Sequence, residues 1–153
     1  EERGEYSWGS VVEKIYYTGT IRKQEGNAKS QQLVSDQQRL LAYLESREQE
    51  FTVFRGHVMK QPGQYKEKGV DVKIAVDIVL KAAKNQYDTV ILVSSDTDLI
   101  PAIEAIKEFG KRVEYVGFSH RQSFGMLKTA ASSRLLRKQE LEQFLPPTLF
   151  KAA

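Results

Sequence analysis

An apolar run that ends in an acidic turn is the feature that most limits what this chain can fold into. Residues 89–93 read Thr-Val-Ile-Leu-Val, the next five read Ser-Ser-Asp-Thr-Asp, and a second apolar stretch follows. A short apolar run bounded by turn residues predicts a buried strand, and the spacing after it predicts a helix. Asp96 and Asp98 therefore lie where a strand is followed by a helix, the usual position of a site in an open α/β sheet.

These two carboxylates predict a metal site. Carboxylates that are held close together repel each other unless a cation lies between them. We therefore interpret Asp96 and Asp98 as ligands of a divalent metal ion, and the metal ion as the reaction centre. The alternative is that either acid only caps the following helix, where a negative charge is favourable in any case.

Strands and helices alternate along the whole chain. Strands are expected at residues 11–20, 51–59, 89–93, 112–118 and 134–136. Helices are expected at residues 28–47, 70–85, 97–109, 123–131 and 138–144, and a polar loop at residues 60–68. This order predicts a Rossmann-like α/β domain whose mostly parallel sheet is covered by helices on both faces. The helix at 70–85 is apolar on most sides and is expected to be well buried.

Composition narrows the class of protein. The chain has 153 residues, a hydrophobic fraction of 41% and no cysteine, which suits one globular domain and excludes disulfides and cysteine nucleophiles. No apolar stretch approaches the roughly 20 residues that span a bilayer, so we expect no membrane partner and a cytoplasmic location. The net charge of +3 mildly favours a polyanionic partner.

Several loops should meet at the carboxyl edge of such a sheet, because right-handed crossovers bring the ends of parallel strands together. The loop after the second strand carries Lys66, Lys68 and Asp71, and the loop after the fourth carries His120 and Arg121. Acids surrounded by cations suit the hydrolysis of a phosphodiester, since carboxylates hold the metal while Lys and Arg hold phosphates.

The same residues also have ordinary structural interpretations. Asp71 can compensate the dipole of the helix that it begins, and Asp77 lies four residues from both Lys73 and Lys81, as in an ion-pair ladder. The loop cations can be solvated surface residues. The sequence contains no nucleophile elbow, P-loop or dinucleotide fingerprint, so it lacks the motifs of serine hydrolases, P-loop nucleotide hydrolases and dinucleotide-dependent enzymes.

Short motifs follow one another in a recognisable order. They are KGVDV at 68–72, AVD at 75–77, VILVSSDTD at 90–98, GKRV at 110–113 and VG at 116–117. In this order they resemble the NYN domain, a family with a PIN-like nuclease fold, from about Tyr16 to Leu136. The resemblance implies that Asp71, Asp96 and Asp98 belong to the family's proposed metal centre and that position 77 is commonly acidic.

The chain departs from the family pattern in three places. Ser95 replaces the glycine of S-G-D-x-D, and Ser132 follows Ala130-Ala131 where the family often has an acid. The family's first strand, which is central and carries a D-x-N motif, has no counterpart here, and a sheet without its central strand would leave backbone groups unpaired. We therefore expect roughly 10–30 further residues before Glu1, with an apolar run that ends in an Asp.

Together these observations predict a PIN-like α/β domain over residues 1–137, followed by a C-terminal helix and tail at 138–153. The predicted function is hydrolysis of single-stranded RNA with Mg²⁺ or Mn²⁺, and the choice of RNA over DNA is mainly what the resemblance implies. The metal ligands would be Asp71, Asp96 and Asp98, with Asp77 as a further candidate. Ser94 or Thr97 would orient a ligand or a water. The phosphate-binding residues would be Lys66, Lys68, His120 and Arg121.

Two other functions stay open. One is a non-catalytic module on the same fold that binds nucleic acid or another protein, which the serines at positions 95 and 132 favour. The other is a hydrolase of small phosphate esters, because carboxylate-bound Mg²⁺ serves both reactions. The oligomeric state is also open, with a dimer among the alternatives.

Overall fold

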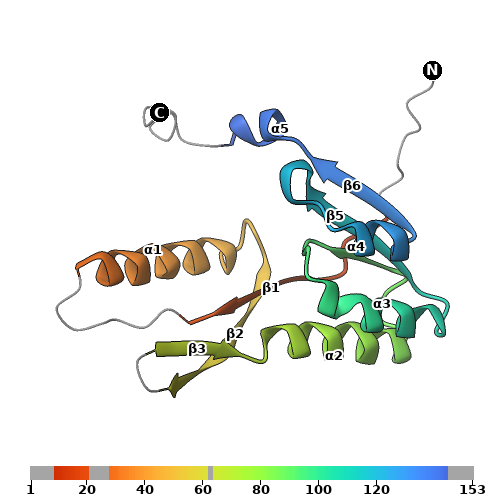
Figure 1. Cartoon of the computed structure of the whole chain (residues 1–153), viewed down its shortest axis with the longest axis horizontal. Helices are drawn as coiled ribbons and strands as arrows, with labels where there is room; N and C mark the ends of the chain where they lie inside the picture. The colour runs from red at the N-terminus through yellow and green to blue at the C-terminus, as the bar shows by residue number, and fades with distance from the viewer. Residues whose placement is uncertain (1–8, 21–27, 62–63, 145–153) are drawn as a thin grey trace. The chain divides into compact units, whose positions relative to one another are not determined.

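The computed structural model describes residues 9–20, 28–61 and 64–144, with only the backbone described at 28–29, 57–61 and 64–68 (Figure 1). The chain forms two compact units, the first ending at Val72 and the second beginning at Lys73. Within the described ranges, no helix combines the length and the apolar character that crossing a membrane requires.

The first unit is a three-stranded sheet with one helix. Its strands β1 (Lys14–Gly19), β2 (Phe51–Gln61) and β3 (Gln64–Lys68) follow the order β1-β2-β3, and α1 (Ala28–Leu44) connects the first two. β1 and β2 are parallel, an arrangement that needs a long crossover connection, and α1 supplies it. Val34 and Leu41 are the buried apolar residues of α1.

The polar loop predicted for residues 60–68 is wrong, because the described residues 60–61 and 64–68 belong to two paired strands. β2 and β3 are antiparallel, with Gln61 opposite Gln64 and His57 opposite Lys68. Lys66 and Lys68 are therefore strand residues of β3 and not loop residues. Antiparallel strands can keep one side in water, so polar composition does not exclude them.

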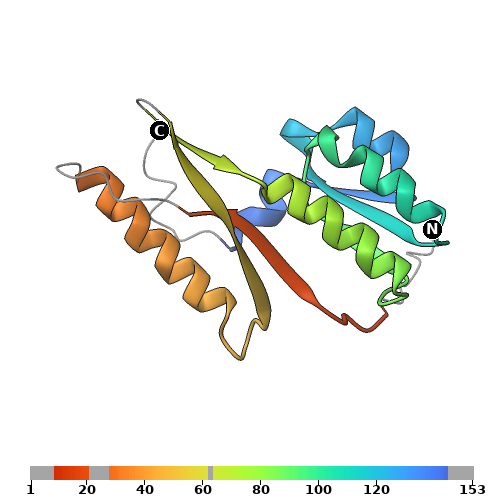
Figure 2. The ribbon, with the colours of Figure 1, turned by 90° about the horizontal axis from the view of Figure 1, so that it is seen from below.

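The second unit is a parallel sheet with helices. Its strands β4 (Thr89–Leu92), β5 (Arg112–Phe118) and β6 (Ser132–Leu136) follow the order β4-β5-β6. The helical elements in chain order are α2 (Val70–Ala83), the 3₁₀ turn η1 (Thr97–Leu99), α3 (Ile100–Lys107), the 3₁₀ turn η2 (Ser119–Arg121), α4 (Phe124–Thr129) and α5 (Lys138–Glu142). Figure 2 shows α2 and α3 lying side by side against this sheet.

The core of the second unit lies between β5 and three helices. Along β5, Val113, Tyr115 and Gly117 are buried, while the residues between them are more exposed, as the period of a strand requires. Helices α2, α3 and α4 cover this face, and the buried members of the core are Ile78, Ala82, Leu92, Leu99, Ile103, Ile106, Val113, Tyr115 and Met126.

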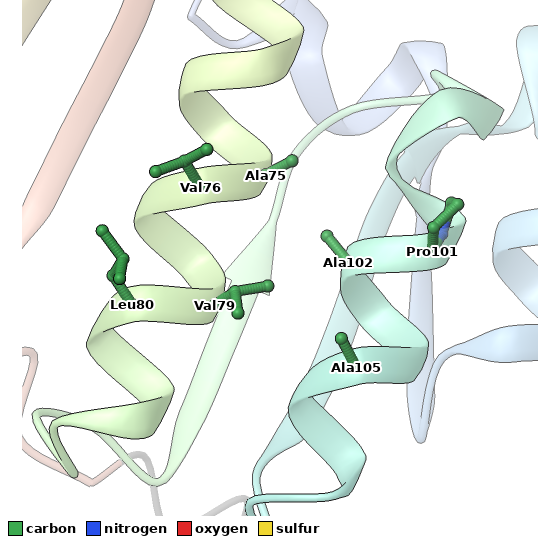
Figure 3. Close-up of a pocket in the computed structure, with 7 residues that line it drawn as sticks. All are labelled: Ala75, Val76, Val79, Leu80, Pro101, Ala102 and Ala105. Atoms are coloured by element: carbon green, nitrogen blue, oxygen red, sulfur yellow. The ribbon is translucent and has the colours of Figure 1, made fainter.

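Helix α2 is less buried than its apolar sequence predicts. Ile78 and Ala82 are buried, but Val76 is 44% exposed and Leu80 is 50% exposed. Figure 3 shows these two side chains pointing away from α3, while Val79 points toward it. The prediction of a well-buried helix is therefore wrong for one face of α2.

A groove of about 430 Å³ separates α2 from α3, and it is lined by apolar side chains. Small residues form its α3 wall, where Ala102 and Ala105 face the other helix (Figure 3). None of its lining residues carries a titratable group, so the groove offers nothing that could bind or activate a phosphate.

The predicted fold class is confirmed. The chain is α/β, three of the four pairings between described strands are parallel, and helices flank the sheets. The described strands form two sheets, whereas one was expected. The strands β4 and β5 begin and end within one residue of their predicted positions, because burial imposes a clear apolar pattern on both.

Burial of one tyrosine gives the second unit a predictable response to alkaline pH. The hydroxyl of Tyr87 donates to the carbonyl of Ile78 at 2.8 Å, and burial raises the pKa of Tyr87 to about 12. An unfolded chain ionises the same phenol near 10, so the folded state holds more protons between these values. The stabilisation by the neutral phenol is complete below about pH 10 and disappears as the pH rises through about 12.

We therefore expect Tyr87→Phe to flatten the loss of stability across this alkaline range. The measurement is the urea midpoint of unfolding of wild type and variant at a series of pH values from neutral to alkaline. Because the other tyrosines titrate in both proteins, the difference between the two curves isolates Tyr87. Parallel curves would show that this phenol is not responsible.

Candidate active site

The acidic turn, residues 94–98, begins where β4 ends and is held by its own side chains. The hydroxyl of Ser94 accepts a hydrogen bond from the backbone N–H of Asp96 at 3.2 Å. Asp96 is extended, and its Oδ1 accepts from the backbone N–H of Asp98 at 2.9 Å. Asp96 is thus the N-cap of η1, so the capping interpretation is correct for one of its two carboxylate oxygens.

Capping does not account for Asp98. Its backbone N–H is the donor in the cap, while its side chain is exposed in the first turn of η1. Within the described part of the chain, the Asp98 carboxylate forms no hydrogen bond or ion pair with another residue. It is therefore accessible to a cation from solution.

The core fixes the far side of the turn. Leu99 is 1% exposed and ends η1, and Ile103 on the next turn of helix is fully buried. Pro101 lies in the first turn of α3, where its missing N–H costs nothing. The two acids are consequently presented from a rigid base and not from a free loop.

The second loop of the site, residues 119–123, follows the neighbouring strand β5. His120 and Arg121 are both exposed there, and the ring of His120 lies 6.1 Å from that of Phe118, measured between centroids. The hydroxyl of Ser95 donates to the carbonyl oxygen of Arg121 at 3.2 Å. The structure therefore brings the acidic turn and the 119–123 loop together, as the parallel arrangement of β4 and β5 predicts.

The residue that links these loops was not predicted from the sequence. The hydroxyl of Tyr115 lies 3.0 Å from that of Ser95 and accepts from the backbone N–H of Ser123 at 3.2 Å. A buried tyrosine normally needs a partner for its hydroxyl. Tyr115 lies near the carboxyl end of a central strand. That position was the only sequence signal that its hydroxyl would bond to the neighbouring loops.

The other predicted ligands lie on α2. Asp71 is exposed in the first turn of the helix and belongs to the first unit. Asp77 forms an ion pair with Lys73, which agrees with the ladder interpretation. Among the described residues, no group of three or more His, Asp or Glu side chains lies close enough together to hold a metal ion. The three-acid centre thus stays a prediction.

Asp96 and Asp98 fit Mg²⁺ or Mn²⁺ by the chemistry of their donors. Both metals prefer hard oxygen ligands, and Mg²⁺ is commonly held by one or two carboxylates with water in its other positions. The Oδ2 atom of Asp96, both oxygens of Asp98 and the hydroxyl of Ser94 are donors of this kind. A metal ion that prefers thiolate ligands would find none in this chain, because the chain has no cysteine.

Comparisons with known proteins agree with this architecture. A family model described as the NYN domain matches residues 3–137. The chain is also similar to the crystal structure of a protein of unknown function from Vibrio parahaemolyticus, with a TM-score of 0.60 and 23% sequence identity over 83% of this chain and 70% of that one. At this identity the likeness shows the fold alone. None of the curated proteins matches the chain.

Removing the Asp98 charge should separate a metal ligand from a surface acid. We expect Mg²⁺ to stabilise the wild type by about 1.4 kcal/mol when the ion is at ten times its dissociation constant. Asp98→Asn should lose this increment and should melt no lower than the wild type in EDTA, because repulsion from Asp96 is relieved. Thermal melts of both proteins with EDTA and with Mg²⁺ measure this.

The matched control is Glu104→Gln, an equal charge change at an exposed position of α3 in the same unit. It should keep the full response to Mg²⁺. If the wild type does not respond to Mg²⁺, or if both variants lose the response equally, Asp98 is not a ligand.

Proposed function

The chain belongs to the NYN domain family, whose fold is that of PIN-like nucleases, and we propose that it is a metal-dependent ribonuclease that cleaves single-stranded RNA. The observation that most directly supports this proposal is the Ser95–Arg121 hydrogen bond. It keeps the turn that carries the partly buried Asp96 and the exposed Asp98 beside the loop that carries Arg121. Hydrolysis of a phosphodiester needs carboxylates and a cationic group next to each other.

In the proposed site, Asp96 and Asp98 hold Mg²⁺ or Mn²⁺, and Asp77 is a further candidate. When bound, the metal supplies an activated water and neutralises charge on the phosphate. The cap on Asp96 Oδ1 restricts rotation of that carboxylate, so its other oxygen is already oriented when a ligand arrives. The Asp96 carboxylate therefore loses little freedom on binding.

Other polar groups of the chain would bind the phosphate and orient the water. Arg121 binds non-bridging phosphate oxygens through its planar guanidinium, and His120 assists it. The hydroxyl of Ser94 accepts from Asp96, which leaves its proton available to orient a water or a phosphate oxygen. Thr97 offers a second hydroxyl at the start of η1.

The family supports the choice of polymer. NYN domains generally act on nucleic acids, and the proposal of RNA follows from membership in that family. A hydrolase of small phosphate esters is less well supported, because the groove between α2 and α3 has no charged lining. Such an enzyme would need a concave pocket with convergent polar groups.

A non-catalytic RNA-binding module is the second candidate. It is favoured by the lack of a three-acid group among the described residues and by Ser95 in place of the family's usual glycine. Such a protein would bind RNA through the same cations and would leave it intact. An activity assay and a binding assay on the same variants therefore separate the two functions.

We expect Asp96→Asn to abolish cleavage without unfolding the protein. Asparagine is as good an N-cap as aspartate, because its Oδ1 still accepts from the Asp98 N–H, but it lacks the charge that holds a metal. Loss of a ligand should lower turnover by more than about 100-fold, the upper range for loss of an outer-shell partner. The measurement is cleavage of a fluorescent single-stranded RNA with Mg²⁺ or Mn²⁺, and with EDTA.

Asp88→Asn is the matched control, since Asp88 is an exposed residue that directly precedes β4, at the end of that strand opposite the acidic turn. It should cleave at the wild-type rate. Wild-type rates from Asp96→Asn would remove Asp96 from the site, and an inactive wild type that binds RNA would establish the second candidate.

Binding of RNA should depend on Arg121 and should do so through charge. In the Asp96→Asn background, Arg121→Gln should weaken binding and lower the slope of log K against log salt by about 0.7, the value for one contact to a single strand. Arg112→Gln removes the same charge at the other end of β5 and should leave the slope unchanged. Fluorescence anisotropy titrations at several salt concentrations measure both, and equal slopes for the two variants would contradict the assignment.

A further inference from the structure

The path of the Tyr115 side chain is fixed by a glycine on the same strand. Tyr115 is completely buried, and Gly117 lies two residues later on the same face of β5. A Cβ atom at position 117 would lie 2.2 Å from the Tyr115 hydroxyl oxygen and 2.5 Å from Cζ, distances that no real side chain tolerates. The ring therefore extends over Gly117 toward the carboxyl end of the strand, where the two loops of the site begin.

The donor and the acceptor can be assigned for each hydrogen bond of the Tyr115 hydroxyl. Ser95 donates its proton to the carbonyl oxygen of Arg121, which can only accept. The Ser95 oxygen must then accept from Tyr115 in the contact between their hydroxyls at 3.0 Å. The Tyr115 oxygen in turn accepts from the backbone N–H of Ser123 at 3.2 Å. All three groups are satisfied by one continuous chain.

This hydrogen-bonded chain joins the three parts of the second unit that surround the site. Ser95 belongs to the acidic turn and Arg121 to the loop after β5. Ser123 caps α4, since its hydroxyl accepts from the backbone N–H of Met126 at 3.4 Å. A buried strand residue therefore links the acidic turn, the 119–123 loop and the start of the next helix.

We propose that Tyr115 and Ser95 form a positioning pair that holds the acidic turn, which carries Asp96, against the backbone of the loop that carries Arg121. The proposal rests on the function proposed above, in which Asp96 holds the metal and Arg121 holds the phosphate. Ser95 occupies a position where the family pattern has glycine, and a glycine could not make either hydrogen bond. The serine is therefore a second means, besides the backbone, by which this chain holds its site together.

The primary test is Tyr115→Phe, which removes the hydroxyl and keeps the ring. Tyr87→Phe is the matched control, because it also removes a phenol hydroxyl that is hydrogen-bonded within the second unit, but the partner is the carbonyl of Ile78 on α2. Misplacement of a reacting group by about 1 Å can cost about 100-fold, so we expect Tyr115→Phe to lower kcat by roughly 10- to 100-fold with little change in KM. Tyr87→Phe should change neither constant.

A second variant tests the pair. Ser95→Gly should lower kcat to a similar extent, and the double variant Ser95→Gly/Tyr115→Phe should be no worse than the more damaging single variant, since both remove one connection. Because Ser95 lies at the surface, this variant also keeps the proposal testable if Tyr115→Phe fails to fold. Additive losses in the double variant would contradict a pair.

A readout that needs no cleavage keeps the two proposals apart. Amide hydrogen exchange measured by NMR should become faster at Ser123 and Asp98 in Tyr115→Phe and should stay unchanged there in Tyr87→Phe. If the wild type does not cleave RNA, the proposed function fails and the exchange data alone decide whether Tyr115 positions the loops. Unchanged exchange at both amides, or a kcat equal to that of Tyr87→Phe, would overturn the positioning role.

Discussion

The second unit depends on the burial of one face of β5. This strand pairs with β4 on one side and β6 on the other, and among the described residues neither outer strand has another partner within its sheet. Its inward residues pack against Ile103, Ile106 and Met126 from two of the helices above it. The acidic turn follows β4 and the 119–123 loop follows β5. The packing of β5 therefore determines the geometry of the site, although β5 contributes no acid to it.

Capping and metal binding are compatible roles for Asp96. A carboxylate has two oxygens, and the turn uses one of them to accept the Asp98 N–H. The cap thereby limits the directions in which the second oxygen can point, and preorganised groups act without the cost of being ordered during the reaction. An acid that stabilises a helix terminus is for this reason well suited to hold a ligand as well.

Structural features that are determined by residues close together in the sequence could be predicted, and features that depend on distant residues could not. β4, β5 and the strand–turn–helix junction follow from apolar patterns that span only a few neighbours. The hairpin of Lys66 and Lys68 was missed because its strands are polar, and the exposed face of α2 because periodicity marks apolar residues without showing what covers them. The role of Ser95 depends on Tyr115 and Arg121, which are 20 and 26 positions away, and no local pattern reports such contacts.

The ring of Tyr115 occupies the space that a side chain at position 117 would fill. The two positions are consequently not free to vary one at a time. A larger residue at 117 is compatible only with a smaller one at 115, and that smaller residue would leave Ser95 and the N–H of Ser123 without their shared partner. Sequence drift in this protein is therefore expected to change the strand residues and the loop residues as a set, so that the tyrosine, the glycine and the serine are retained or lost together.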